Sequence, residues 1–164
     1  MRLYAMPFHY FGGKLKNNHF IFESVGTMTS GYKLTSNISS KIHPLTRVQT
    51  DGSFYQRNKR GGVAALLYCQ SIQGFTYPLE HLDDSTEAEW ASVYFGLEMA
   101  KKSNLTLIGL ENDCLSVVRH IMMNDRGKKD YIQYYHHKIK GVADELQWCG
   151  IRWIPRELNQ ADAL

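Results

Sequence analysis

From about residue 47 onward, the hydrophobic positions follow two different spacings along the chain. Short apolar or β-branched runs separated by turn residues come first, and these are typical of strands. Later, apolar residues repeat every three or four positions, most clearly from Ile132 to Leu146, before Gly150 ends the pattern. This patterning predicts strands over residues 48–55, 62–70, 72–79, 105–110 and 151–154, and helices over residues 84–102, 115–123, 132–146 and 159–164.

The predicted elements follow the order β-β-β-α-β-α-α-β-α. Short turns between the first three strands favour an antiparallel meander, and Pro78 favours an edge position for the third strand. The last two strands alternate with helices, as in right-handed β-α-β crossovers. We therefore expect an α/β fold with a mixed five-stranded sheet, three antiparallel strands and then two parallel ones, and helices on its faces.

The first 46 residues have a different pattern, in which turn signals such as Gly12-Gly13 separate short β-like runs. We expect a small β-rich extension there, with a β-hairpin as one form, before a main domain at residues 47–164. Residues 1–47 carry six Lys or Arg against one acid, whereas the rest of the chain carries 13 basic and 15 acidic groups. A basic arm favours a polyanionic partner such as nucleic acid, or a protein partner, although on charge alone a solvated extension is the simpler explanation.

Length and composition exclude several classes of protein. The 164 residues fit one domain with an extension, and the balance of 43% hydrophobic to 21% charged residues argues against disorder. No apolar run is long enough for a transmembrane helix or the core of a secretion signal, so we expect an intracellular protein, cytoplasmic or associated with nucleic acid. Cys69, Cys114 and Cys149 are too widely spaced for a zinc motif or a disulfide framework, which fits a reducing compartment.

Four acids fall where functional sites gather in open sheets, at strand ends and the adjacent helix starts. Asp51 lies in the first strand, Glu89 near the start of the first long helix, Asp113 after the fourth strand and Asp162 in the last helix. Four carboxylates brought together would repel one another, so they must raise their pKa values or hold cations. Oxygen ligands suit hard divalent ions, and Mg²⁺ needs only a few carboxylates beside waters and phosphates.

Each acid also has a purely structural explanation. Asp51 could belong to a turn, and Thr86 and Glu89 have the spacing of a capping box at a helix start. Asp113 could be the N-cap of the following helix, and Asp162 a surface residue near the end of the chain. The case for a site therefore rests on all four acids occurring in this order at these elements.

The motifs around the acids add a more specific signal. In order, they are TDGS at 50–53, GG at 61–62, STEAEW at 85–90, ND at 112–113 and WIPRELNQADAL at 153–164. In this order and at this spacing, they resemble type 1 ribonuclease H of the ribonuclease H-like superfamily, most closely its plant-type and archaeal-like branch. The resemblance covers residues 47–164, and the closing run is its most specific part.

The resemblance implies a ribonuclease H-like catalytic domain whose catalytic and metal-binding acids are Asp51, Glu89, Asp113 and Asp162. Glu89 is chosen over Glu87 because the family's glutamate directly precedes a large residue. The implied cofactor is two Mg²⁺ ions, with Mn²⁺ as a substitute. The implied reaction is hydrolysis of the RNA strand of an RNA/DNA hybrid, giving 5′-phosphate and 3′-hydroxyl ends, with no membrane involved.

Substrate contacts are expected from residues that line the same end of the sheet or its first turn. The candidates are Gly52, Ser53, Arg57, Lys59, Arg60 and Thr86, with Glu157 and Asn159 as auxiliary residues of the last loop.

Three departures from the family pattern keep alternatives open. Ser85 and Thr86 replace an Asn pair that often reads the RNA strand, and Glu157 stands near the place of a missing loop histidine. Residues 124–129 are also too short for the basic protrusion of some members. One alternative is a nuclease of the same fold that acts on double-stranded RNA or branched DNA. The other is a non-catalytic nucleic-acid-binding domain that uses the basic arm.

Overall fold

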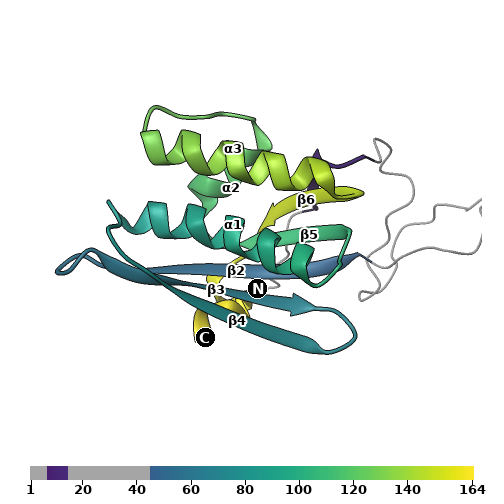
Figure 1. Ribbon diagram of the computed structural model, residues 1–164, viewed down its shortest axis with the longest axis horizontal. Coiled ribbons are helices and arrows are strands. Elements are labelled where there is room, and N and C mark those ends of the chain that lie inside the picture. The colour runs from purple at the N-terminus through teal and green to yellow at the C-terminus, as the bar shows by residue number, and fades with distance from the viewer. Residues whose placement is uncertain (1–6, 15–44) are drawn as a thin grey trace, which may run out of the picture.

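The computed structural model describes residues 7–14 and 45–164, and the strands in these ranges form one mixed sheet of six strands (Figure 1). The order across the sheet is β1-β6-β5-β2-β3-β4. β2, β3 and β4 are antiparallel neighbours, while β5 and β6 run parallel to β2. The elements are β1 (His9–Gly12), β2 (Thr46–Tyr55), β3 (Arg60–Tyr68), β4 (Ile72–Leu79), α1 (Ser85–Lys102), β5 (Leu107–Asn112), α2 (Leu115–Met122), α3 (Asp130–Glu145), β6 (Trp148–Trp153) and the 3-10 turns η2 (Arg156–Leu158) and η3 (Gln160–Ala163).

The α/β class, the antiparallel meander, the two parallel strands and the edge position of β4 are confirmed. The predicted count of five strands is wrong, because residues 9–12 of the N-terminal extension form β1, which pairs antiparallel with β6 at the other edge. β5 also extends to Asn112, two residues beyond its predicted end. The predicted hairpin and most basic residues of the N-terminal extension fall in residues 1–6 and 15–44, which lie outside the described residues.

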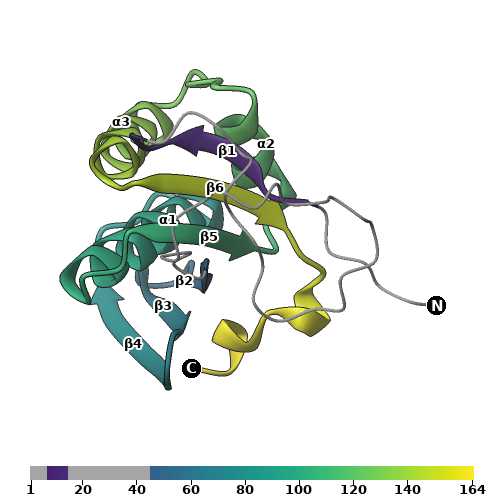
Figure 2. The same ribbon diagram turned by 90° about the vertical axis from the view of Figure 1, so that its right-hand side faces the viewer.

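The two faces of the sheet are covered differently. Figure 1 shows α1, α2 and α3 on one face, while η2 and η3 lie against the other face, as the turned view in Figure 2 also shows. The predicted helix over residues 159–164 is wrong, because this segment forms only the 3-10 turn η3, with Asn159 as its N-cap. Within the described ranges, no helix has both the length and the apolar character needed to cross a membrane.

The main core lies between the sheet and the helices. It includes fully buried side chains from β2, β3, α1 and β5, and the largest of them is Trp90. α1 comes unusually close to β2 at Gly52, where a Cβ atom would lie 2.3 Å from the carbonyl oxygen of Ala88. Only glycine permits this approach, and it brings the second turn of α1 directly beside the middle of β2.

β1 is attached to the sheet through aromatic packing as well as strand pairing. The Phe8 ring lies over Gly109, where a Cβ would come within 2.5 Å of it. The same ring meets Trp148 edge-on at 6.4 Å between centroids, and the Arg152 guanidinium lies 4.1 Å from its centroid. This segment is therefore an integral part of the domain's structure.

Replacing Phe8 by Ala should destabilise the protein by about 2 kcal/mol, less than the ~3–5 kcal/mol of a fully buried Phe, because the ring is half-buried. Urea unfolding followed by circular dichroism would measure the change. His9→Ala is the control, since His9 is the exposed neighbour in the same segment. Equal stability of the two variants would contradict the structural role of β1.

Candidate active site

Three of the four predicted acids converge at one end of the sheet. One carboxylate oxygen from each of Asp51, Glu89 and Asp113 lies within 4.8 Å of the other two, and all three residues are half-buried. The strand register explains two of them. Because Gln49 of β2 pairs with Glu111 of the parallel strand β5, the residues two positions further along, Asp51 and Asp113, emerge side by side.

Glu89 reaches the same place from α1. The close contact between Gly52 and α1 places the backbone of Glu89 beside β2. The predicted choice of Glu89 over Glu87 agrees with the geometry, because Glu87 has another role. Asp84 is the N-cap of α1 and accepts a hydrogen bond from the Glu87 N–H at 2.9 Å, while the Glu87 carboxylate accepts one from the Asp83 N–H.

The structural explanations considered for three of the acids are therefore wrong. Asp84 and Glu87 cap the start of α1, so Glu89 takes no part in capping. Asp51 lies inside β2 and belongs to no turn. The residue at the N-cap position of α2 is Cys114, whose N–H is bonded by the Asn112 side chain at 2.8 Å, so Asp113 caps nothing.

Asp162 lies beside this cluster but outside the set of three. It belongs to η3, and its carboxylate pairs with the Arg156 guanidinium at 3.1 Å. Asp162 is close enough that its charge raises the pKa of both Asp51 and Asp113, whereas the positive charge of Arg156 lowers them. The structure thus places the fourth predicted acid at the rim, with Arg156 as its counter-charge.

Burial and mutual repulsion change the protonation of the cluster. Desolvation, reinforced by the charges of Asp51 and Asp113, raises the pKa of Glu89 to about 8. Desolvation and the charges of Asp113 and Asp162 raise the pKa of Asp51 to about 6, and burial raises that of Asp113 as well. Without a cation, Glu89 is therefore mostly protonated at neutral pH.

The donor set identifies the kind of ion that fits. Three carboxylates that are half-exposed offer only oxygen ligands and leave room for water, which suits a hard divalent cation rather than a soft one. A cation at this position would offset the repulsion that raises the three pKa values. The cluster is therefore a candidate divalent-metal centre.

Asn112 is a site residue that was noted in the sequence only as part of a motif. Its buried side-chain amide donates to the Thr50 carbonyl at 3.1 Å and to the Glu89 carboxylate at 3.2 Å. It thereby connects β5, β2 and α1 and holds Glu89 in place, and this hydrogen bond opposes the rise of the Glu89 pKa. Its position directly before Asp113 at a strand end was the available signal.

The two predicted auxiliary residues, Asn159 and Glu157, differ in burial and in their contact with the acids. Asn159 is buried, donates to the Thr50 carbonyl at 3.0 Å and lowers the pKa of Asp113 through a side-chain hydrogen bond, so it contacts the cluster. Glu157 is exposed on η2.

The predicted substrate contacts lie along β2, the turn after it and the start of α1. The space beside Gly52 is occupied by the backbone of α1. The Ser53 hydroxyl donates weakly to the Gly62 carbonyl at 3.5 Å. Arg57 is exposed on the turn, and Thr86 lies in the first turn of α1. Lys59 and Arg60 have protein partners: Lys59 donates to the Asp83 carbonyl at 3.4 Å, and Arg60 pairs with Glu80 at 3.1 Å.

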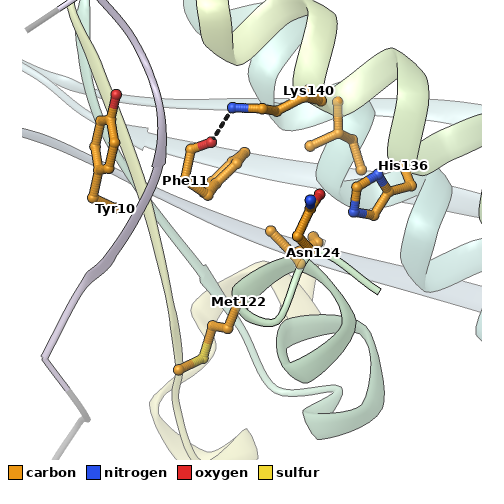
Figure 3. A pocket seen from close by; sticks show the side chains of 8 residues that line it. Tyr10, Phe11, Met122, Asn124, His136 and Lys140 are labelled. Carbon is orange, nitrogen blue, oxygen red and sulfur yellow. Dashed lines mark hydrogen bonds between the residues drawn. The ribbon is translucent and has the colours of Figure 1, made fainter. Parts of the chain in front are cut away.

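A cavity of about 270 Å³ lies elsewhere, between β1, α2 and α3 (Figure 3). Its lining is mostly apolar, with His136 and Asn124 on one side and Lys140, which donates to the Phe11 carbonyl, on another. None of the four acids lines this cavity. The half-buried carboxylate cluster is therefore separate from this cavity.

A family model described as reverse transcriptase-like matches residues 49–164. No curated protein sequence matches the chain.

Solved structures share the fold. The N-terminal ribonuclease H domain of a Mycobacterium tuberculosis protein matches with a TM-score of 0.67 at 18% identity, over 73% of this chain and 88% of that one. Ribonuclease H1 from the archaeon Halobacterium salinarum gives 0.68 at 18%, over 73% and 92%. A ribonuclease H1 from compost, in complex with RNA/DNA hybrid, gives 0.64 at 17%, over 73% and 92%. The predicted ribonuclease H-like fold is confirmed.

The raised pKa of Glu89 predicts a pH-dependent stability for the metal-free protein. Between pH 6 and pH 8, the unfolded chain has already lost the Glu89 proton that the folded chain keeps, so the free energy of unfolding falls as pH rises. Relative to wild type, Glu89→Gln should therefore gain about 1–2 kcal/mol over this interval.

Thermal unfolding in a chelator at several pH values measures this difference. The interval starts near pH 6 because Asp51, whose pKa is about 6, is at least half-ionised above that pH. Parallel curves for wild type and Glu89→Gln would show that Glu89 ionises normally. Adding Mg²⁺ should remove the pH dependence in wild type, because a bound cation favours the ionised carboxylates.

Proposed function

The chain belongs to the reverse transcriptase-like family, within the ribonuclease H-like superfamily, and we propose that it is a ribonuclease H that cleaves the RNA strand of RNA/DNA hybrids. The observation that carries this proposal is the convergence of Asp51, Glu89 and Asp113 within 4.8 Å. The ribonuclease H1 neighbours support the enzyme class, and one of them was crystallised with an RNA/DNA hybrid.

Two Mg²⁺ ions are the proposed cofactor, held by Asp51, Glu89, Asp113 and Asp162, with Mn²⁺ as a substitute. When bound, such ions supply an activated water and a clamp on the oxygens of the scissile phosphate. Glu89 gives up its proton as the ions bind, since its pKa lies near 8 without them. The products are a 5′-phosphate and a 3′-hydroxyl.

The remaining residues of the site position these carboxylates and the substrate. Asn112 and Asn159 hold Glu89 and Asp113 through hydrogen bonds that also fix the backbone of β2 at Thr50. Arg156 lies where it can exchange Asp162 for a phosphate once a cation neutralises that carboxylate. Arg57, on the exposed turn after β2, contacts the nucleic-acid backbone.

To cleave the RNA strand and not DNA, the protein must contact the 2′-hydroxyl groups of the RNA. The backbone around Gly52 and Ser53 and the first turn of α1 at Thr86 are the proposed readers, since the first two follow Asp51 in β2 and Thr86 precedes Glu89 by one helical turn. Ser85 and Thr86 replace the Asn pair of the family pattern, and this substitution favours a second candidate, cleavage of double-stranded RNA. A panel of labelled hybrid, duplex RNA and duplex DNA separates the two.

Asp51→Asn and Glu89→Gln should each lower Mg²⁺-dependent cleavage of a labelled hybrid by about 10²-fold or more, the scale for losing one group that stabilises transition-state charge. Gel analysis of the products measures the rate and identifies the ends. Glu87→Gln is the matched control, because Glu87 lies two residues from Glu89 but only caps α1.

The control should keep near-normal cleavage and near-normal stability, because a Gln side chain can also accept the hydrogen bond from the Asp83 N–H at this capping position. No cleavage of any substrate by wild type, or equal cleavage by wild type and Asp51→Asn, would overturn the proposed function.

A further inference from the structure

A buried polar network lies on the face of the sheet opposite the helices, beneath the C-terminal turns. Its centre is Gln49 of β2, which is only 2% exposed. Gln49 lies two residues before Asp51, so both side chains leave β2 on the same face. The proposed chemistry uses Asp51 and leaves Gln49 without a role.

Both polar atoms of the Gln49 side-chain amide, Nε2 and Oε1, make hydrogen bonds. Its Nε2 donates to the Glu111 carboxylate at 2.9 Å and to the Leu158 carbonyl at 3.0 Å. Its Oε1 accepts from the Tyr68 hydroxyl at 3.0 Å and from the Gln160 N–H at 2.9 Å. One buried side chain therefore binds the backbone of the C-terminal segment at two points, on either side of Asn159.

These two points control where Asp162 lies. Gln160 is the first residue of η3, and Asp162 is the third, so a bond to the Gln160 N–H fixes the start of the turn that carries the acid. The Tyr68 hydroxyl adds a bond to the Gln160 side chain at 2.7 Å, and Ala161 packs against Ala64 of β3. Together with the hydrogen bond from Asn159 to the Thr50 carbonyl, the contact with Gln49 attaches this turn to the strand that carries Asp51.

Glu111 in turn fixes Gln49. Its carboxylate is 1% exposed and is bound by Arg47, at 3.0 and 3.1 Å, and by Arg152. These hydrogen bonds hold the pKa of Glu111 below its usual value despite burial. A buried ion network of this kind adds little stability compared with apolar packing, but each of its hydrogen bonds restricts the orientation of the Glu111 carboxylate that Gln49 contacts.

We infer that Gln49 is a positioning residue, held by Glu111, that locks the C-terminal turn and so keeps Asp162 beside Asp51 and Asp113. This inference deepens the proposed function and rests on it for the kinetic effect, whereas its structural effect stands independently.

Gln49→Met is the test variant, since it keeps the length of the side chain and removes all four hydrogen bonds. Hydrogen exchange should become at least about tenfold faster at the backbone N–H of Gln160, with core strands unchanged. The Kd for Mn²⁺, measured by calorimetry, should rise about tenfold, the lower end of the ~10–100-fold effect of groups that orient metal ligands. For hybrid cleavage, kcat at a fixed Mg²⁺ level should fall while KM changes little.

Ile139→Val is the control, because Ile139 is a buried residue of α3 that is not among the partners of the C-terminal turns. It should lower Tm without altering Mn²⁺ affinity or exchange at Gln160. Tyr68→Phe is a milder second variant, which loses only the two hydroxyl bonds and should change both quantities in the same direction by a smaller factor. It replaces Gln49→Met if that variant does not fold.

Wild-type Mn²⁺ affinity and wild-type exchange at Gln160 in the folded variant would overturn the inference, even if the wild-type enzyme cleaves hybrids. Conversely, a wild-type protein that binds Mn²⁺ but cleaves nothing would overturn the proposed function and leave the role of Gln49 intact.

Discussion

The constraint on which the structure depends is the repulsion among carboxylates gathered at one end of the sheet. Asp51, Glu89 and Asp113 come from three different elements, and their oxygens lie within 4.8 Å of one another. Burial and proximity raise the pKa of each, to about 8 for Glu89. Such an arrangement opposes folding unless a proton or a cation neutralises it, so its presence indicates a binding role.

The fold satisfies this constraint with attachments on both faces of the sheet. On the helix face, Gly52 permits the close approach of α1, and Asn112 joins Glu89 to β2 and β5. On the opposite face, Gln49 and Glu111 bind the turns that carry the fourth acid. Both sets of contacts begin from the parallel register of β2 and β5, which therefore sets the geometry of the whole site.

Most of the topology, and the convergence of Asp51, Glu89 and Asp113, could be predicted from the sequence, because alternation, helical spacing and motif order can be recognised along the chain. β1 could not be predicted, because its four residues carry no clear pattern. It is held in the sheet through the neighbouring Phe8, which packs against Gly109 and Trp148, about 100 or more positions away. The role of Gln49 was also hidden. Glutamine is usually a surface residue, so the sequence gives no sign that Gln49 is buried. Its burial beside Glu111 depends on the pairing of β2 with β5.

The most direct test of the central claim is a crystal structure of the protein with Mn²⁺, located by its anomalous scattering. We expect an anomalous peak among Asp51, Glu89 and Asp113, with carboxylate oxygens at roughly 2.0–2.2 Å, the range for small hard divalent ions. We also expect Asp162 to turn from Arg156 toward the ions. A structure at high Mn²⁺ concentration with no peak at these three acids would contradict the account.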